Sequence, residues 1–229
     1  MLTVLADLLP IALLGAVLGL DVVSFPQAMV SRPLVAATAA AALLGYPVHG
    51  IVIGAALELI ALETLPFGAS RYPEWGSASV VGGALFASGA PGNPAALIVA
   101  VLAALATARV SSYSMVLLRR LNARWARAHL AEVERGSART VEGLQVWGLT
   151  ADLVRGGVLT AAAYALLRPL TTLALAHWGA SAASSRAFAV GVAATVAAGA
   201  AWKIFHATEG ARWYFLGGLA AGLVLLVLR

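Results

Sequence analysis

A small set of polar residues interrupts strongly apolar sequence in the first third of the chain. Carboxylates, an amide and a guanidinium can together accept and donate hydrogen bonds, which every hydroxyl group of a polyhydroxyl ligand requires. A charge held at membrane depth costs about 2.5 to 3.5 kcal/mol on insertion scales, so such residues usually serve a function. The candidate substrate-binding residues are Asp21, Gln27, Glu58, Glu63, Arg71 and Glu74.

Some of these residues also have a structural interpretation that the sequence leaves open. Glu58 could satisfy backbone groups where a helix unwinds, and Arg71 and Glu74 could pair with each other near the membrane surface. The sequence favours a binding role for Glu58 and does not decide between the two roles for the other pair.

Motifs for bond-making chemistry are missing from the sequence. The four histidines form no HExxH pattern, and there is no Walker-type phosphate loop and no nucleophile elbow. The absence of cysteine excludes disulfides and thiolate metal sites. We therefore expect no catalytic residues, no metal and no cofactor, and no catalysis by this chain alone.

The composition predicts an integral membrane protein. Of the 229 residues, 61% are hydrophobic and only 11% are charged, whereas soluble domains carry about 25% charged residues. The mean hydropathy is +0.90. Since a spanning helix needs roughly 20 apolar residues, this length predicts about six to eight full or partial spans. The predicted fold class is an all-α polytopic membrane protein, with several full spans plus re-entrant or broken helices, in a single membrane domain over 1–229.

Residues 1–94 form the half of the domain in which all the candidate substrate-binding residues lie. A helix over 2–20 is interrupted by Asp21 and by Phe25-Pro26. Two apolar stretches, 33–45 and 48–62, are too short to cross a bilayer, which predicts a re-entrant hairpin. A polar linker over 70–79 then leads to another short apolar segment, 80–90.

The remaining segments are predicted to be membrane spans on either side of one long polar stretch. We expect a full span over 95–118, a cytoplasmic amphipathic surface helix within 119–145 that breaks near Gly136-Ser137, and C-terminal spans over 146–229, including one over 169–180. Six arginines of the polar stretch place it in the cytoplasm by the positive-inside rule. They alternate with glutamates beside membrane spans, which argues against nucleic-acid binding. Asp152 and Arg155 are three apart, which favours a local ion pair.

Several short motifs, in one order and at one spacing, resemble a known family. They are Arg32-Pro33-Leu34, Gly45-Tyr46, Gly50, Gly54, Leu57-Glu58, Gly68-Ala69 and Pro73-Glu74, with a weaker echo in Lys203 and in Trp213-Tyr214-Phe215-Leu216-Gly217. This pattern resembles the membrane-embedded IIC subunit of the mannose/fructose/sorbose family of the bacterial sugar phosphotransferase system. Tyr46 and Glu74 stand where the family usually has aspartate, and Glu63 adds a charge.

The resemblance implies a function and a set of partners. The chain would bind a hexose or an amino sugar and pass it inward across the bacterial cytoplasmic (inner) membrane, where a IIB protein would phosphorylate it. The implied partners are a IID membrane subunit, the cytoplasmic IIB and IIA phosphocarrier proteins and the lipid bilayer, in a homo- or hetero-oligomer. Residues 1–94 would be the sugar-binding and transport half, in which Gln27, Glu58 and Glu74 would meet the sugar, with Asp21 and Arg71 next.

The sequence leaves two other functions open. The chain could be a regulatory or scaffold subunit of the same family that recruits a IIB-like protein without moving solute. It could also be a self-sufficient secondary transporter coupled to protons through Glu58 or Glu63.

Overall fold

The fold is all-α, as predicted, and the computed structural model describes residues 2–62, 72–89, 93–205 and 208–227. Three helices are long and apolar enough to cross a membrane, and two shorter apolar helices accompany them, so the chain is a multi-pass membrane protein. The helices of the described ranges are α1 (Leu2–Asp21), α2 (Pro33–Leu43), α3 (Pro47–Ala61), α4 (Trp75–Ser88), α5 (Pro94–Ala128), α6 (Leu130–Glu134), α7 (Ala138–Ala176), α8 (Ala182–Phe205) and α9 (Ala211–Val227).

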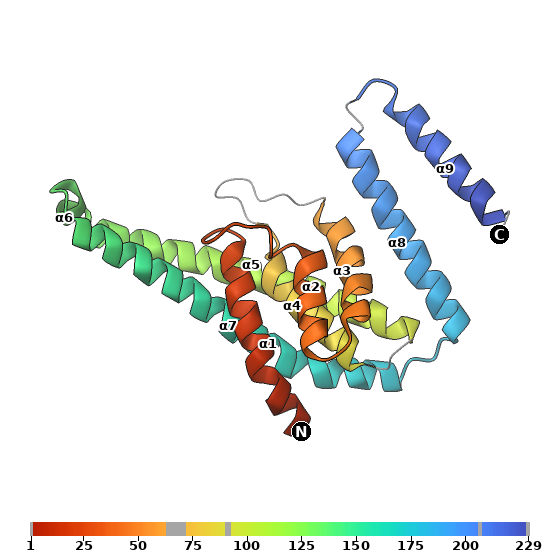
Figure 1. Ribbon diagram of the computed structural model, residues 1–229, viewed down its shortest axis with the longest axis horizontal. Coiled ribbons are helices and arrows are strands. Elements are labelled where there is room, and N and C mark those ends of the chain that lie inside the picture. The colour runs from red at the N-terminus through yellow and green to blue at the C-terminus, as the bar shows by residue number, and fades with distance from the viewer. Residues whose placement is uncertain (1, 63–71, 90–92, 206–207, 228–229) are drawn as a thin grey trace.

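Helix α4 lies at the centre of the bundle (Figure 1) and packs against α1, α2, α3, α5 and α7. Every residue from Trp75 to Ala87 is buried. Small side chains make this burial possible, because they let neighbouring helix backbones approach closely. A Cβ atom added to Gly83 would lie only 2.4 Å from the Ala37 carbonyl oxygen of α2.

Helices α1 and α7 cross at a similarly close contact. A Cβ on Gly15 would lie 2.0 Å from Thr160 Oγ1, and one on Gly156 would lie 3.1 Å from the Gly15 carbonyl oxygen. The glycines are therefore required for the two helices to meet at this distance.

Helices α2 and α3 form the hairpin that the sequence predicts. Each begins with proline at its first turn, where the missing N–H leaves no hydrogen bond unmade. Gly45 joins them with a φ of +85°, a conformation that glycine adopts without steric penalty. With 11 and 15 residues, the two helices are about 17 and 23 Å long, short of the roughly 30 Å hydrocarbon core.

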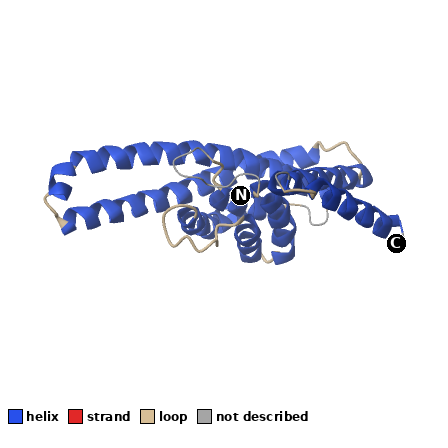
Figure 2. Ribbon diagram, turned by 90° about the horizontal axis from the view of Figure 1, so that it is seen from above, coloured by secondary structure: helices blue, strands red, loops and turns tan. Residues whose placement is uncertain are grey.

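The polar segment after the first long span differs from the prediction of a separate surface helix within 119–145. Helix α5 continues without a break to Ala128, and α7 begins at Ala138, where Ser137 caps it. The two helices run side by side as an arm that projects from the bundle, with short α6 at its tip (Figures 1 and 2). The predicted break near Gly136 is confirmed, since this glycine has a φ of +78°. Alanine, leucine and arginine are strong helix formers, so the change in polarity does not end the helix.

Two other predicted boundaries are also wrong. The linker over 70–79 is shorter, because α4 starts at Trp75, with the Glu74 side chain accepting the backbone N–H of Ser77 at its N-terminus. The separate span over 169–180 is instead the last part of α7, which continues through Pro169. Proline is tolerated inside membrane helices, so a single proline does not have to end a span.

Helices α8 and α9 stand to one side of the bundle (Figure 1). Helix α8 packs against α3 and α5, and α9 packs against α8. Most of their large apolar side chains are exposed, among them Phe188, Trp202, Trp213 and Leu225. In a membrane protein such surfaces face lipid or another subunit.

Candidate functional site

The segment between α1 and α2, residues 22–32, is held in place by a buried carboxylate. Asp21 is only 2% exposed. Its Oδ1 accepts the backbone N–H of Ala28 at 2.7 Å and its Oδ2 accepts that of Ser31 at 2.9 Å. Hydrogen bonds to a carboxylate are roughly twice as strong as neutral ones. We call residues 22–32 the braced loop.

A second carboxylate fixes the far end of the braced loop. Glu58 of α3 forms an ion pair with Arg32, whose Nε donates to Oε1 at 2.6 Å. The other carboxylate oxygen of Glu58, Oε2, accepts the backbone N–H of Leu34, in the first turn of α2, at 3.2 Å. The Arg32 and Glu58 side chains are 31% and 21% exposed, so this pair reaches the surface while Asp21 does not.

Gln27 also belongs to the braced loop, and it is the amide among the candidate residues. Its side chain is exposed, and the amide nitrogen donates to the Val23 carbonyl of the same loop. Gln27 and Met29 both have left-handed backbone conformations, with φ of 59° and 62°. Residues other than glycine seldom adopt this conformation, so the hydrogen bonds to Asp21 maintain an unfavourable backbone course that turns these side chains outward.

Glu74 lies elsewhere, in the core of the bundle, and is fully buried. Its Oε1 accepts the Ser77 N–H at 3.0 Å and its Oε2 accepts the Ser111 hydroxyl at 2.6 Å. The carboxylate therefore joins α4 to α5 and has no exposed surface for a ligand in this conformation.

The structure thus separates the predicted site residues into groups. Asp21 and Glu58 bind the two ends of the braced loop, which carries Gln27, and Gln27 and Glu58 are accessible, whereas Glu74 is buried between α4 and α5. Glu63 and Arg71 lie outside the described residues.

A buried polar network connects four parts of the chain, and the sequence indicated only one of its contacts. The predicted pair of Asp152 and Arg155 is present at 2.8 Å, with both side chains less than 10% exposed. Arg155 Nη1 also donates to the hydroxyls of Ser111 and Ser114, at 3.1 and 3.2 Å. Ser24 of the braced loop donates to the second oxygen of Asp152.

This network runs from Ser24 through Asp152, Arg155 and Ser111 to Glu74, and so ties the braced loop to α7, α5 and α4. The signal in the sequence was the pair of serines three residues apart, Ser111 and Ser114, on the predicted span over 95–118. Without the tertiary structure their partners could not be identified.

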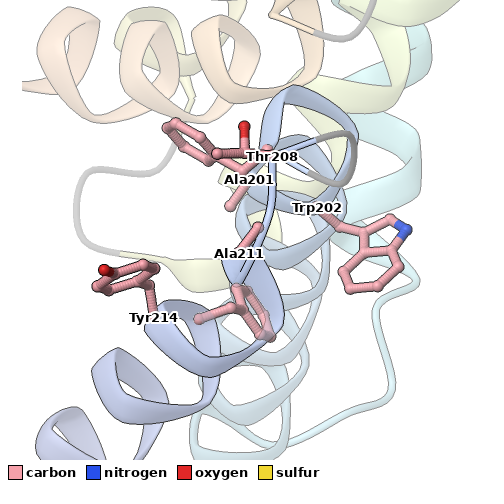
Figure 3. A pocket seen from close by; sticks show the side chains of 7 residues that line it. Ala201, Trp202, Thr208, Ala211 and Tyr214 are labelled. Carbon is pink, nitrogen blue, oxygen red and sulfur yellow. The ribbon is translucent and has the colours of Figure 1, made fainter.

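A separate groove of about 350 Å³ lies between the facing ends of α8 and α9 (Figure 3). Its walls are mainly apolar and aromatic, with Trp202, Phe205, Tyr214 and Phe215 among them. Few polar groups line it to orient a polyhydroxyl ligand, so this groove does not match the binding site that the sequence predicts. Within the described residues, no group of three or more histidines and carboxylates is placed to hold a metal ion.

The comparisons with known proteins agree with this fold. The sequence matches the family of sorbose-specific IIC components of the phosphotransferase system over residues 5–221. A solved structure titled as a membrane protein superimposes with a TM-score of 0.73 at 19% identity, covering 97% of this chain and 91% of that one. The mannose transporter ManYZ, solved in complex with microcin E492, superimposes with a TM-score of 0.62 at 17% identity, covering 97% and 94%.

At these identities the structural comparisons establish a shared fold. A comparison with curated protein sequences gives no match. The family match, in contrast, covers nearly the whole sequence. The chain belongs to the family of sorbose-specific IIC components of the phosphotransferase system.

Proposed function

We propose that this chain binds a hexose or an amino sugar at the braced loop and passes it inward across the bacterial cytoplasmic membrane. The observation that carries this proposal is the partly exposed ion pair of Arg32 and Glu58, which presents a guanidinium and a carboxylate at the end of a loop that also carries the exposed amide of Gln27. Together they supply both donors and acceptors for sugar hydroxyls.

The ion pair at this surface is suited to a polyhydroxyl ligand. The Glu58 carboxylate has several acceptor positions, of which the contacts to Arg32 and Leu34 use only some. A sugar hydroxyl can therefore donate to Glu58 while a neighbouring hydroxyl accepts from Arg32 or from the Gln27 amide. Because Asp21 holds the loop backbone in position, little conformational freedom is lost on binding.

We further propose that the chain works in a complex. Membership of the IIC family supports a IID membrane subunit, with IIB and IIA proteins that relay phosphate on the cytoplasmic side. The similar fold of the mannose transporter ManYZ supports the same assignment. The arginine-bearing arm of α5, α6 and α7 is the surface that we expect to meet the IIB protein.

Sugar binding to the purified chain, co-expressed with its IID subunit, tests the proposed site. We expect saturable binding of at least one radiolabelled sugar from a panel of L-sorbose, D-mannose, D-fructose and D-glucosamine. Glu58→Gln removes the charge that orders Arg32, and hydrogen bonds to charged groups contribute about 1.5–3 kcal/mol, so affinity should fall roughly tenfold or more.

Glu134→Gln is the matched control, since this carboxylate is exposed on α6, far along the chain from the braced loop. Binding that both variants retain would contradict the proposed site. A folded complex that binds no sugar would favour a scaffold subunit, and pH-driven uptake by the chain alone would favour a proton-coupled transporter.

A further inference from the structure

A second cleft, of about 290 Å³, lies where α5 and α7 leave the bundle to form the arm. Its walls come from three elements: the start of the braced loop, the C-terminal half of α5 and the N-terminal half of α7. We call it the elbow cleft and define it by Ser24, Met115, Arg119, Asn122, Gln145 and Asp152.

The elbow cleft combines apolar walls with polar groups of both kinds. Met115, together with Leu118 and Leu149, lines the apolar side. Asn122 and Gln145 bring two amides, each with a donor and an acceptor, and Arg119 brings a guanidinium that donates to the Tyr72 hydroxyl at 2.6 Å. A small apolar cleft with a few convergent polar groups is the usual form of a ligand site.

One side chain in the wall of the cleft, Asn122, has hydrogen-bonding capacity that the described residues do not fill. The Oδ1 atom of Asn122 is buried and accepts no hydrogen bond from any described residue. Buried acceptors are nearly always paired, because an unpaired one loses its interaction with water without replacement. The amide nitrogen of Asn122 lies beside Gly148 in the cleft wall, and from there it can donate to a hydroxyl oxygen of a ligand in the elbow cleft.

The glycine opposite Asn122 keeps the space for such a ligand open. Gly148 of α7 also lines the cleft, and a Cβ atom placed on it would lie 3.6 Å from Asn122 Nδ2. Any larger side chain at this position would extend into the cleft beside the Asn122 amide.

The charges at the base of the cleft indicate which class of ligand fits. Asp152 is neutralised by Arg155, and its other oxygen accepts the Ser24 hydroxyl. Its charge is therefore already balanced, and a cation gains little there. The remaining groups are amides, a hydroxyl and the Arg119 guanidinium, which together suit a ligand with several hydroxyl groups.

We propose that the elbow cleft is a second binding site, and that its ligand is a polyhydroxyl compound. This chemistry has two sources in a membrane: a free sugar, or the glycerol headgroup of a phospholipid. The proposal goes beyond the sugar site at the braced loop and does not require it, although Ser24 belongs to both regions.

Because the chain contains no cysteine, single cysteines can report on each site separately. Gln145→Cys places a thiol in the elbow cleft, Met29→Cys places one on the exposed braced loop, and Glu142→Cys is a control on the exposed surface of α7. Each is introduced into the full chain with its IID subunit, purified in a detergent without a sugar headgroup, and its rate of maleimide labelling is measured.

The probes separate the two sources of ligand. L-sorbose, D-mannose and D-glucosamine test for a free sugar, and nanodiscs of phosphatidylglycerol, compared with phosphatidylcholine, test for a lipid headgroup. We expect at least one of these probes to slow labelling of Gln145→Cys severalfold and to leave Glu142→Cys unchanged. Protection of Met29→Cys alone would support the braced loop and overturn the elbow cleft.

Two further variants test whether protection depends on the cleft. Adding Gly148→Leu fills the space, and adding Asn122→Leu removes the unpaired acceptor. Each should abolish the protection of Gln145→Cys. Asn122→Leu should also leave the melting temperature unchanged or higher, whereas a purely structural Asn122 would lower it.

Gly143→Leu is the matched control for Gly148→Leu, because a Cβ there meets nothing within 4 Å. Labelling of Gln145→Cys that no probe slows, or protection that persists in both cleft variants, would overturn the proposal. Glu58→Gln can be added to each single-cysteine variant. If it removes the protection of Met29→Cys and leaves Gln145→Cys protected, the two sites are independent.

Discussion

Asp21 and Glu58 act at opposite ends of one loop, and their different exposures give them different roles. Asp21 is buried and binds two backbone N–H groups, while Glu58 reaches the surface beside Arg32. We therefore interpret Asp21 as the residue that shapes the loop and Glu58 as one that contacts the ligand.

Replacement of Asp21 tests this distinction. Asp21→Ala leaves the N–H groups of Ala28 and Ser31 without their acceptor, and we expect it to destabilise the protein by about 3 kcal/mol and to abolish sugar binding. Asp21→Asn keeps one acceptor oxygen and should have an intermediate effect. Thermal unfolding in detergent measures the stability of the two variants, and a sugar-binding assay in detergent measures their affinity. Normal binding by Asp21→Ala would show that the loop does not depend on this carboxylate.

The buried pair of Asp152 and Arg155 allows a second prediction at this scale. Removing one partner leaves an uncompensated charge in the bundle, so Arg155→Met should cost about 3 to 5 kcal/mol. The double variant Asp152→Leu/Arg155→Met should be less destabilised than Arg155→Met, since no buried charge remains. A double-mutant cycle from thermal melts measures the difference, and additive losses would contradict the pairing.

The same residues show how far sequence could predict the site. The spacing of Asp152 and Arg155 predicted their pair, because it depends on one helix alone. It could not predict that Ser24, Ser111 and Glu74 join them, since these contacts depend on how α1, α4, α5 and α7 pack. For the same reason the sequence grouped Glu74 with the sugar-binding residues, whereas the structure buries it between helices.

At the scale of elements, the packing of α1 on α7 depends on glycine. Gly15→Leu would place its side chain against Thr160, so we expect a destabilisation of about 1–3 kcal/mol, the usual range for overpacking. Gly191→Leu on α8 is the control, since a Cβ there meets nothing within 4 Å. Thermal unfolding of the two variants should differ clearly, and equal stability would show that α1 and α7 can move apart without penalty.

The predicted elements were correct where the chain itself contains the helix-ending signal. Pro33, Gly45 and Pro47 set the bounds of the α2 and α3 hairpin locally. The boundaries at 79, 118 and 169 were inferred from changes in polarity or from one proline, and there the helices continue or begin elsewhere. Polarity determines which surroundings a helix has, and it does not determine where its hydrogen bonding stops.

At the scale of the whole molecule, the length of the arm separates the surface at its tip from the surface of the helical bundle. Helices α5 and α7 have 35 and 39 residues, so they are about 52 and 58 Å long and exceed the roughly 30 Å hydrocarbon core. The stacked rings of Trp125 and Trp147, with centroids 4.7 Å apart, hold the two helices together along the arm. The arm therefore presents the arginines of its outer part, near α6, beyond the bundle, whereas Arg119 at its base lines the elbow cleft with Ser24.

Charge reversal on the arm tests whether it meets the IIB protein. Arg124→Glu combined with Arg127→Glu should weaken IIB association roughly tenfold or more at low salt, and the difference should shrink as salt rises. Arg186→Glu, on the exposed surface of α8, is the control. Association is measured by the binding of IIB to the detergent-solubilised complex immobilised on a sensor surface. Equal affinity of the arm variant and the control would place the IIB surface elsewhere.

The braced loop has a consequence for how specificity can diverge in evolution. Its course is fixed mainly by one buried carboxylate that binds backbone groups, and backbone groups are the same whatever side chain is attached. Phe25, Met29 and Val30 are exposed on this loop, so substitutions there leave the anchoring contacts intact. The loop can therefore acquire new side chains without losing its shape, in the way that antibody loops diversify on a constant framework, and it offers a site for directed selection of altered sugar preference.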